Sequence, residues 1–176
     1  MEQNHDTIHE NLRERVAARL EEKRPIMLAT LAQELEASEL EVARALPESM
    51  RDFVGGNMFE EVWSDFAGWE QATFIMTHLG NVLEVRGKIP AGSFGHGYFN
   101  LTGEGALGGH VRADAVAEIC FLSLPFMGLE SLSVQFFNAE GSVMFSVYVG
   151  REKHQLVPAV RSAFLALRDR LCPAGK

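Results

Sequence analysis

Residues 72–87 read ATFIMTHLGNVLEVRG, and this stretch decides how the rest of the chain folds. Thr, Val, Ile and Phe dominate it with a period of two, which is typical of β-strands, whereas the apolar residues before it recur every three or four positions. The pair Gly80-Asn81 divides the stretch, and such pairs favour tight hairpin turns. We therefore predict a strand over 72–79, a turn at 80–81 and an antiparallel return strand over 82–87.

Further extended segments follow toward the C-terminus, and short turns separate them. After a loop at 90–93, the predicted strands are 98–101, 108–112, 116–124, 132–137 and 143–149. No segment of helical length lies between these strands, so parallel crossover connections are excluded. The pattern predicts an antiparallel meander.

Amphipathic helical patterns lie on both sides of these strands. They predict a helix over 8–23, two short helices within 27–46, a helix over 58–66 and a last helix over 157–171. The fold class is therefore α+β, with N-terminal helices, a large antiparallel β-sheet and a C-terminal helix. The best boundary is Gly55-Gly56, so we expect one compact domain that consists of an N-terminal helical segment, 1–55, and an antiparallel sheet with flanking helices, 56–176.

The two short helices within 27–46 have the pattern of a helix-turn-helix. Between them Ser38 is a predicted N-cap, and Glu41 completes a capping box. The second helix would have to read the major groove of DNA, but it carries Glu39 and Glu41 beside Arg44, and carboxylates repel phosphate. We interpret the pair as a packing module and keep a transcriptional regulator as the weaker alternative.

The composition favours an acidic protein of the cell interior. Its 176 residues include 24 acidic and 16 basic side chains, and the net charge of -8 argues against nucleic acid or an anionic membrane as the main partner. The contexts of Cys120 and Cys172 do not indicate a disulfide framework, which favours a reducing compartment. The N-terminal residues lack the pattern of a secretory signal, and no apolar run approaches the roughly 18 residues of a membrane span. We therefore expect a cytoplasmic protein that does not insert into the membrane.

A glycine-flanked group of ring side chains is the candidate for chemistry. His96 and Tyr98 surround Gly97, and His110 follows the pair Gly108-Gly109. Imidazole nitrogen and phenol oxygen are donors that haem iron or another transition metal accepts, and glycine lets a flat ligand approach the backbone. The same residues also fit a turn next to a core aromatic side chain, so residue types alone leave both interpretations open. Signatures of phosphate loops, nucleophile elbows and zinc-binding helices are absent, which disfavours hydrolysis, phosphoryl transfer and hydride transfer.

Five segments, taken in order, resemble one known family. They are ALPE at 45–48, GYFNL at 97–101, GHV at 109–111, PFMG at 125–128 and YVGREKHQL at 148–156. Their sequences and spacing are similar to those of the intracellular haem-utilisation carrier proteins of Gram-negative bacteria, the ChuX/HutX type, over residues 28–158. The resemblance implies a cytoplasmic protein that binds imported haem as its cargo and delivers it to a haem-degrading enzyme. It also implies a homodimer.

The resemblance assigns roles residue by residue. His110 occupies the place of the family's haem-associated histidine, and Tyr98 occupies the place of a tyrosine that other relatives have near the haem. A second histidine of some members falls on Thr77, and the adjacent His78 points to the opposite face of its strand, so it does not replace that side chain. We therefore expect either Tyr98 or His110 to contact the haem iron, with His96 as a loop residue at the rim of the pocket.

Haem is a broad apolar plate with two carboxylates and an iron, so its site needs an apolar wall, an axial donor and a few cations. The expected wall residues are Phe94, Phe99, Phe126 and Met127, and the expected partners of the propionates are Arg86, Lys88 and Arg112. No catalytic residue is assigned. The alternative from another functional class is an enzyme that opens the porphyrin or releases its iron.

Overall fold

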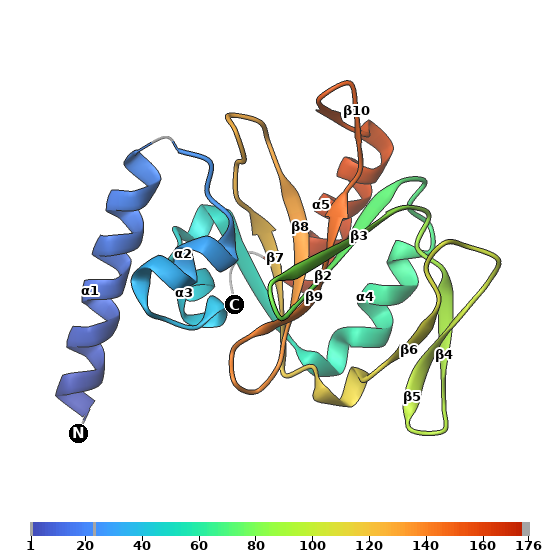
Figure 1. Ribbon diagram of the computed structural model, residues 1–176, viewed down its shortest axis with the longest axis horizontal. Helices are drawn as coiled ribbons and strands as arrows, with labels where there is room; N and C mark the ends of the chain where they lie inside the picture. The colour runs from blue at the N-terminus through green and yellow to red at the C-terminus, as the bar shows by residue number, and fades with distance from the viewer. Residues whose placement is uncertain (1, 23, 174–176) are drawn as a thin grey trace.

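A six-stranded antiparallel sheet forms the centre of the protein (Figure 1). The computed structural model describes residues 2–22 and 24–173. The strands lie in the order β1-β7-β8-β9-β2-β3, and their bounds are β1 Arg51–Gly55, β2 Ala72–His78, β3 Asn81–Gly87, β7 Glu118–Ser123, β8 Leu132–Phe137 and β9 Val143–Val149. The large antiparallel sheet and the hairpin predicted at 72–87 are confirmed.

The first hairpin turns one position earlier than predicted. His78 pairs with Asn81, which leaves Leu79 and Gly80 as the two turn residues, with positive φ angles of 49° and 79°. Two successive residues with positive φ are typical of the type I′ turn, whose twist matches that of the strands. Asn81 begins the return strand instead, and its side-chain amide donates a hydrogen bond to the carbonyl of His78 at 3.2 Å, which braces the turn.

One face of the sheet packs against two helices, α4 (Phe59–Phe66) and α5 (Pro158–Leu171). Trp63 of α4 is completely buried there, and Phe136 stacks on Phe145 with ring centroids 4.5 Å apart. Truncating a buried ring of this kind to alanine costs about 3–5 kcal/mol, because apolar contacts are lost and a cavity remains. This aromatic layer is the main core, and it confirms the predicted C-terminal helix.

The other face of the sheet is covered in part by three N-terminal helices, α1 (Glu2–Glu21), α2 (Leu28–Leu35) and α3 (Glu39–Ala45). They lie over β1 and β7, where Cys120 and Leu122 are buried beneath them (Figure 1). In the part of the chain that the structure describes, no helix lies over this face of β2 and β3. The N-terminal helices therefore leave this face of β2 and β3 uncovered.

The predicted capping box joins α2 to α3. The Oγ of Ser38 accepts a hydrogen bond from the backbone N–H of Glu41 at 3.2 Å, and the Glu41 carboxylate accepts one from the backbone N–H of Ser38 at 2.8 Å. Both N–H groups lie near the helix start, where the backbone has no partner of its own. The capping box is therefore confirmed.

Four strands were missed by the sequence patterns: β1, β4 and the short pair β10 (Arg151–Glu152) and β11 (Gln155–Leu156). Residues 51–55 form β1, but the four residues before Gly55 are all half-buried, so no alternation with a period of two marks this strand. Residues 91–95 form β4 in place of the predicted loop, because glycine occupies two of its five positions and weakens the signal.

A second, three-stranded sheet lies against α4 (Figure 1) and consists of β4 (Ala91–Gly95), β5 (Tyr98–Thr102) and β6 (Gly109–Val111). Phe99 of β5 is buried against Phe59 and Trp63, with ring centroids 5.2 and 5.8 Å apart. A Cβ at Gly92 would lie 2.2 Å from the Phe99 ring, so only glycine lets the ring cross β4. The indole N–H of Trp63 also donates to the carbonyl of Pro90 at 2.9 Å, which ties the small sheet to α4.

Candidate functional site

The outer face of the three-stranded sheet brings Tyr98, Asn100 and His110 together. Asn100 pairs with His110 across β5 and β6, and Tyr98 lies two residues before Asn100, so the three side chains share one face. The ring centroids of Tyr98 and His110 are 5.7 Å apart, and both side chains are exposed. The two predicted iron donors therefore lie side by side on an open surface.

A hydrogen bond links His110 to the neighbouring strand. Its Nδ1 lies 2.7 Å from the Oδ1 of Asn100, and the Nδ2 of Asn100 donates to the carbonyl of Gly95 at 2.9 Å. Gly95 pairs with Tyr98 at a tight turn in which His96 has a positive φ of 54°. His96 is thus an exposed turn residue.

Arg112 follows β6 and pairs with a carboxylate of this chain. Its Nε and Nη2 donate to the two carboxylate oxygens of Asp114 at 2.8 and 2.9 Å. These hydrogen bonds raise the pKa of Arg112 and lower the pKa of Asp114. Both side chains are exposed and water screens their attraction, so Arg112 can exchange Asp114 for the carboxylate of a ligand.

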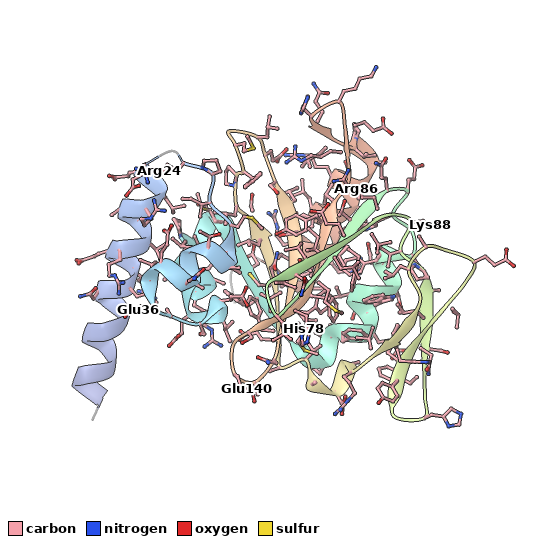
Figure 2. The ribbon with its side chains drawn as sticks, in the orientation of Figure 1. Arg24, Glu36, His78, Arg86, Lys88 and Glu140 are labelled. Atoms are coloured by element: carbon pink, nitrogen blue, oxygen red, sulfur yellow. The ribbon has the colours of Figure 1, made fainter. Side chains whose placement is uncertain are left out.

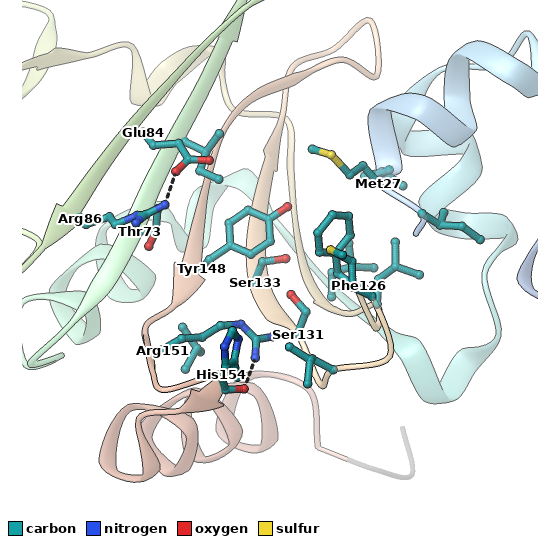
Figure 3. Close-up of a pocket in the computed structure, with 18 of the residues that line it drawn as sticks. Met27, Thr73, Glu84, Arg86, Phe126, Ser131, Ser133, Tyr148, Arg151 and His154 are labelled. Atoms are coloured by element: carbon teal, nitrogen blue, oxygen red, sulfur yellow. Dashed lines mark hydrogen bonds and ion pairs between the residues drawn. The ribbon is translucent and has the colours of Figure 1, made fainter. Parts of the chain in front are cut away.

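A cavity of about 650 Å³ contains three other predicted site residues, Arg86, Phe126 and Met127 (Figure 3). Its walls come from the segment between α1 and α2, from the loop after β7 and from one face of β2, β3, β8 and β9. Arg86 is already paired with Glu84 at 2.9 Å. Lys88 lies two residues beyond Arg86, outside the strand, and is exposed (Figure 2).

The cavity has an apolar end and a polar end. Met27 and Phe126 form part of the apolar end, Arg151 and His154 lie together at the polar end, and Tyr148 lies between the two ends (Figure 3). A wall of apolar side chains beside basic groups suits a flat apolar ligand that carries carboxylates. Sequence reasoning did not select Tyr148, Arg151 or His154, although all of them lie in the segment 148–156 that carried part of the family resemblance.

Arg151 anchors the tight turn that carries His154. Its guanidinium donates to the carbonyls of His154, at 3.1 Å, and of Glu130. Lys153 and His154 have positive φ angles of 49° and 69°, a conformation that costs a residue with a side chain about 1–2 kcal/mol. The chain therefore holds a histidine at the cavity in a backbone conformation that favours glycine.

The predicted site residues fall into two groups on opposite faces of the six-stranded sheet. Thr73 of β2 lines the cavity, whereas its neighbour Phe74 packs into the core that also contains Phe99. Phe99 is only 1% exposed, and its pairing with Phe94 puts both rings on the inner side of the small sheet. Both rings therefore lie behind the face that carries Tyr98.

Strand β2 also separates Thr77 from His78. Thr77 shares the face of Thr73, and His78 lies on the alternate face at the hairpin end of the strand (Figure 2). This alternation agrees with the expectation that His78 does not take the place of Thr77.

Among the side chains that the structure describes, those of residues 11–22 and 24–173, no three His, Cys, Asp or Glu are grouped so as to hold a metal ion. No helix in the part of the chain that the structure describes is long and apolar enough to cross a membrane.

Cys120 and Cys172 are free thiols, and burial raises the pKa of Cys172 to about 11.

Comparison with known proteins matches this chain to one protein family. A family model described as "Haem utilisation ChuX/HutX" matches residues 53–167. The chain is 35% identical over 163 residues to "Intracellular heme transport protein HutX" of Vibrio cholerae serotype O1, and the match covers 92% of this chain and 84% of that protein.

Solved structures are similar as well. "Crystal structure of ChuX" matches with a TM-score of 0.82 and 33% identity, and covers 89% of this chain and 97% of that one. Apo-PhuS, a heme-binding protein from Pseudomonas aeruginosa, matches with a TM-score of 0.72 and covers 90% of this chain but 46% of its own length. At 13% identity the second match shows the fold alone.

The strained turn at the cavity leads to a stability prediction. His154→Gly is expected to be more stable than His154→Ala by about 1 kcal/mol, because glycine adopts the positive φ without strain and both variants lose the imidazole. Urea denaturation followed by circular dichroism measures the difference. Equal stability of the two variants would contradict the strain at this position.

Proposed function

Because the chain belongs to the ChuX/HutX haem-utilisation family, we propose that it is an intracellular haem carrier that passes haem to a haem-degrading enzyme. The observation that carries the proposal is the 35% identity, over 92% of the chain, to a protein named for intracellular heme transport. A relative of known structure, 33% identical, is described as "the Heme Binding Protein ChuX" and supports haem as the cargo.

In this proposal either Tyr98 or His110 contacts the haem iron. Both side chains are exposed, and their rings are 5.7 Å apart, so either can reach a ligand that approaches the small sheet. Phenol oxygen and imidazole nitrogen are both known axial donors to haem iron. A single donor on an open face favours transfer, because the cargo can leave without a large rearrangement of the protein. Arg112, which follows His110 by two residues, is the nearby cation for a propionate.

The apolar wall for this haem comes, in our proposal, from a second subunit. Phe94 and Phe99 lie on the inner side of the small sheet, whereas Phe126 and Met127 line the cavity on the opposite face of the six-stranded sheet. One subunit therefore offers iron donors on one face and an apolar cavity with basic groups on the other. A homodimer that brings these two faces together would complete the site.

Exposed apolar side chains support a homodimer. The hairpin of β2 and β3 exposes large apolar side chains that are costly to leave in water, with Leu79 87% exposed, Leu83 59% and Val82 57%.

The helix-turn-helix alternative loses support from the contacts of α3. The carboxylate of Glu39 accepts a hydrogen bond from the backbone N–H of Val143 at 2.6 Å, and burial raises its pKa. Arg44 pairs with Glu118 of the sheet at 2.5 Å. These contacts support the interpretation that α3 packs on the sheet.

Haem titration tests the cargo and the donor. Purified protein is expected to develop a Soret band that saturates at a single haem per subunit. Replacing the iron donor, by His110→Ala or Tyr98→Phe, is expected to weaken binding about tenfold or more, which corresponds to roughly 1.4 kcal/mol. His96→Ala, in the exposed turn, is the matched control for the loss of an imidazole. No spectral change with the wild-type protein would refute the proposal.

A single charge tests the homodimer. Leu83→Glu is expected to convert the dimer to a monomer, because it buries an unpaired carboxylate in an apolar contact. Light scattering coupled to size-exclusion chromatography measures the mass, and Ala106→Glu, in an exposed loop, is the control. A monomeric mass for the wild-type protein at micromolar concentration would contradict the dimer.

The haem-degrading alternative predicts chemical turnover. For a carrier, the spectrum of the haem complex is expected to stay unchanged when ascorbate is added in the presence of catalase, which removes peroxide. Loss of the Soret band with release of iron under these conditions would favour the enzyme. A complex made with His110→Ala separates reaction at the site from reaction of free haem.

A further inference from the structure

Asn100 connects the turn of the small sheet to His110. It is the fourth residue of the GYFNL segment, and no role for it follows from the proposed function. In the register of β5 and β6 it stands directly opposite His110, on the face that also carries Tyr98. Its side chain therefore lies within reach of the imidazole.

The hydrogen-bond partners of Asn100 decide which way its amide points. The Nδ2 lies 2.9 Å from the carbonyl oxygen of Gly95, and 3.3 Å from each of the carbonyl oxygens of Ser93 and Tyr98. Carbonyl oxygens only accept hydrogen bonds, so the NH₂ group has to face them. The Oδ1 consequently faces His110, at 2.7 Å from its Nδ1.

This orientation selects a tautomer of His110. An amide oxygen is an acceptor only, so the Nδ1 of the imidazole must carry a hydrogen and donate it. In the neutral ring the other nitrogen, Nε2, then holds the free lone pair. Which nitrogen of a histidine binds a metal is set by the hydrogen bond that the other nitrogen makes.

We propose that Asn100 is a positioning residue that holds His110 in the Nδ1–H tautomer, so that Nε2 is the atom that binds haem iron. This inference rests on the proposed function, because it names the donor atom of that site. It also selects His110 over Tyr98 as the side chain that binds the iron, since the imidazole is oriented before the haem arrives. The tight turn at Gly95 contributes by supplying the carbonyl that fixes the amide.

Nuclear magnetic resonance of the protein without haem tests the tautomer directly. In ¹⁵N-labelled protein at about pH 8.5, above the ordinary histidine pKa, two-bond ¹H–¹⁵N correlations distinguish a protonated ring nitrogen from a bare one. The wild-type protein is expected to show His110 with a protonated Nδ1 and a bare Nε2. Asn100→Ala is expected to shift His110 toward the Nε2–H tautomer, because the acceptor is lost.

Two variants separate the tautomer from the stability of the hairpin. Asn100→Asp keeps an acceptor oxygen beside Nδ1 but loses the donors to Gly95, so it is expected to retain the Nδ1–H tautomer. Thr102 lies two residues after Asn100 in the same strand, and its hydroxyl donates a hydrogen bond to the carbonyl of Ala91. Thr102→Ala removes this hydrogen bond and is expected to leave the tautomer unchanged. A purely structural role predicts instead that Asn100→Ala and Thr102→Ala behave alike.

Ferric haem titration gives the second readout. Asn100→Ala is expected to weaken binding by roughly 10- to 100-fold, the usual effect of losing a partner that orients a metal-binding histidine, whereas Asn100→Asp and Thr102→Ala retain it. An Nε2–H tautomer in the wild-type protein, or unchanged haem affinity in Asn100→Ala, would overturn the inference. Suppose that the wild-type protein and every hairpin variant except Asn100→Ala have the Nδ1–H tautomer, but the wild-type protein binds no haem. This result overturns the proposed function and leaves the orientation of His110 established.

Discussion

The burial of Phe99 against α4 is the contact on which the position of the candidate site depends. β5 belongs to a three-stranded sheet that shares no strand with the six-stranded sheet, so its side chains hold it in place. The Phe99 ring meets Phe59 and Trp63, and Gly92 leaves the space for it. Because neighbouring residues of a strand point to opposite faces, burying Phe99 forces Tyr98 and Asn100 outward. The same contact that completes the core therefore presents the donors to solvent.

The separation of the exposed donor groups from the apolar cavity suits a carrier, which has to bind its cargo and release it. An exposed donor binds a cargo without enclosing it, and a separate apolar cavity offers the area that the cargo needs to leave water. If a second subunit joins the two, the strength of binding depends on an interface rather than on a closed pocket. Such a site can open through a small movement between subunits, which suits transfer of the cargo to a recipient protein. The proposed orientation of His110 by Asn100 fits this arrangement, because in that proposal the donor is ordered before the haem arrives and little additional order is required of the protein.

Much of the fold was predictable because its signals are local. The period of two in Ala72–His78 and Asn81–Gly87, and the capping box of Ser38 and Glu41, depend on residues close in sequence, and the structure confirms them. β1 and β4 were not predictable, because half-buried side chains in the first and glycines in the second remove the alternation that marks a strand. The turn after β2 was displaced by one residue, because Leu79 accepts a positive φ and Asn81 supports the turn from the strand.

The sequence by itself determined which chemical groups this protein has, and in what order: a phenol, an amide and an imidazole in two short strands, and basic and apolar residues elsewhere. It also determined, through the alternation within each strand, that Thr77 and His78 face opposite ways. Only the tertiary structure decided that Phe126, Met127 and Arg86 lie across the sheet from His110, and that Tyr148, Arg151 and His154 join them in one cavity. The physical reason is that the face a strand presents to the core depends on what packs against it, and those partners are distant in the chain.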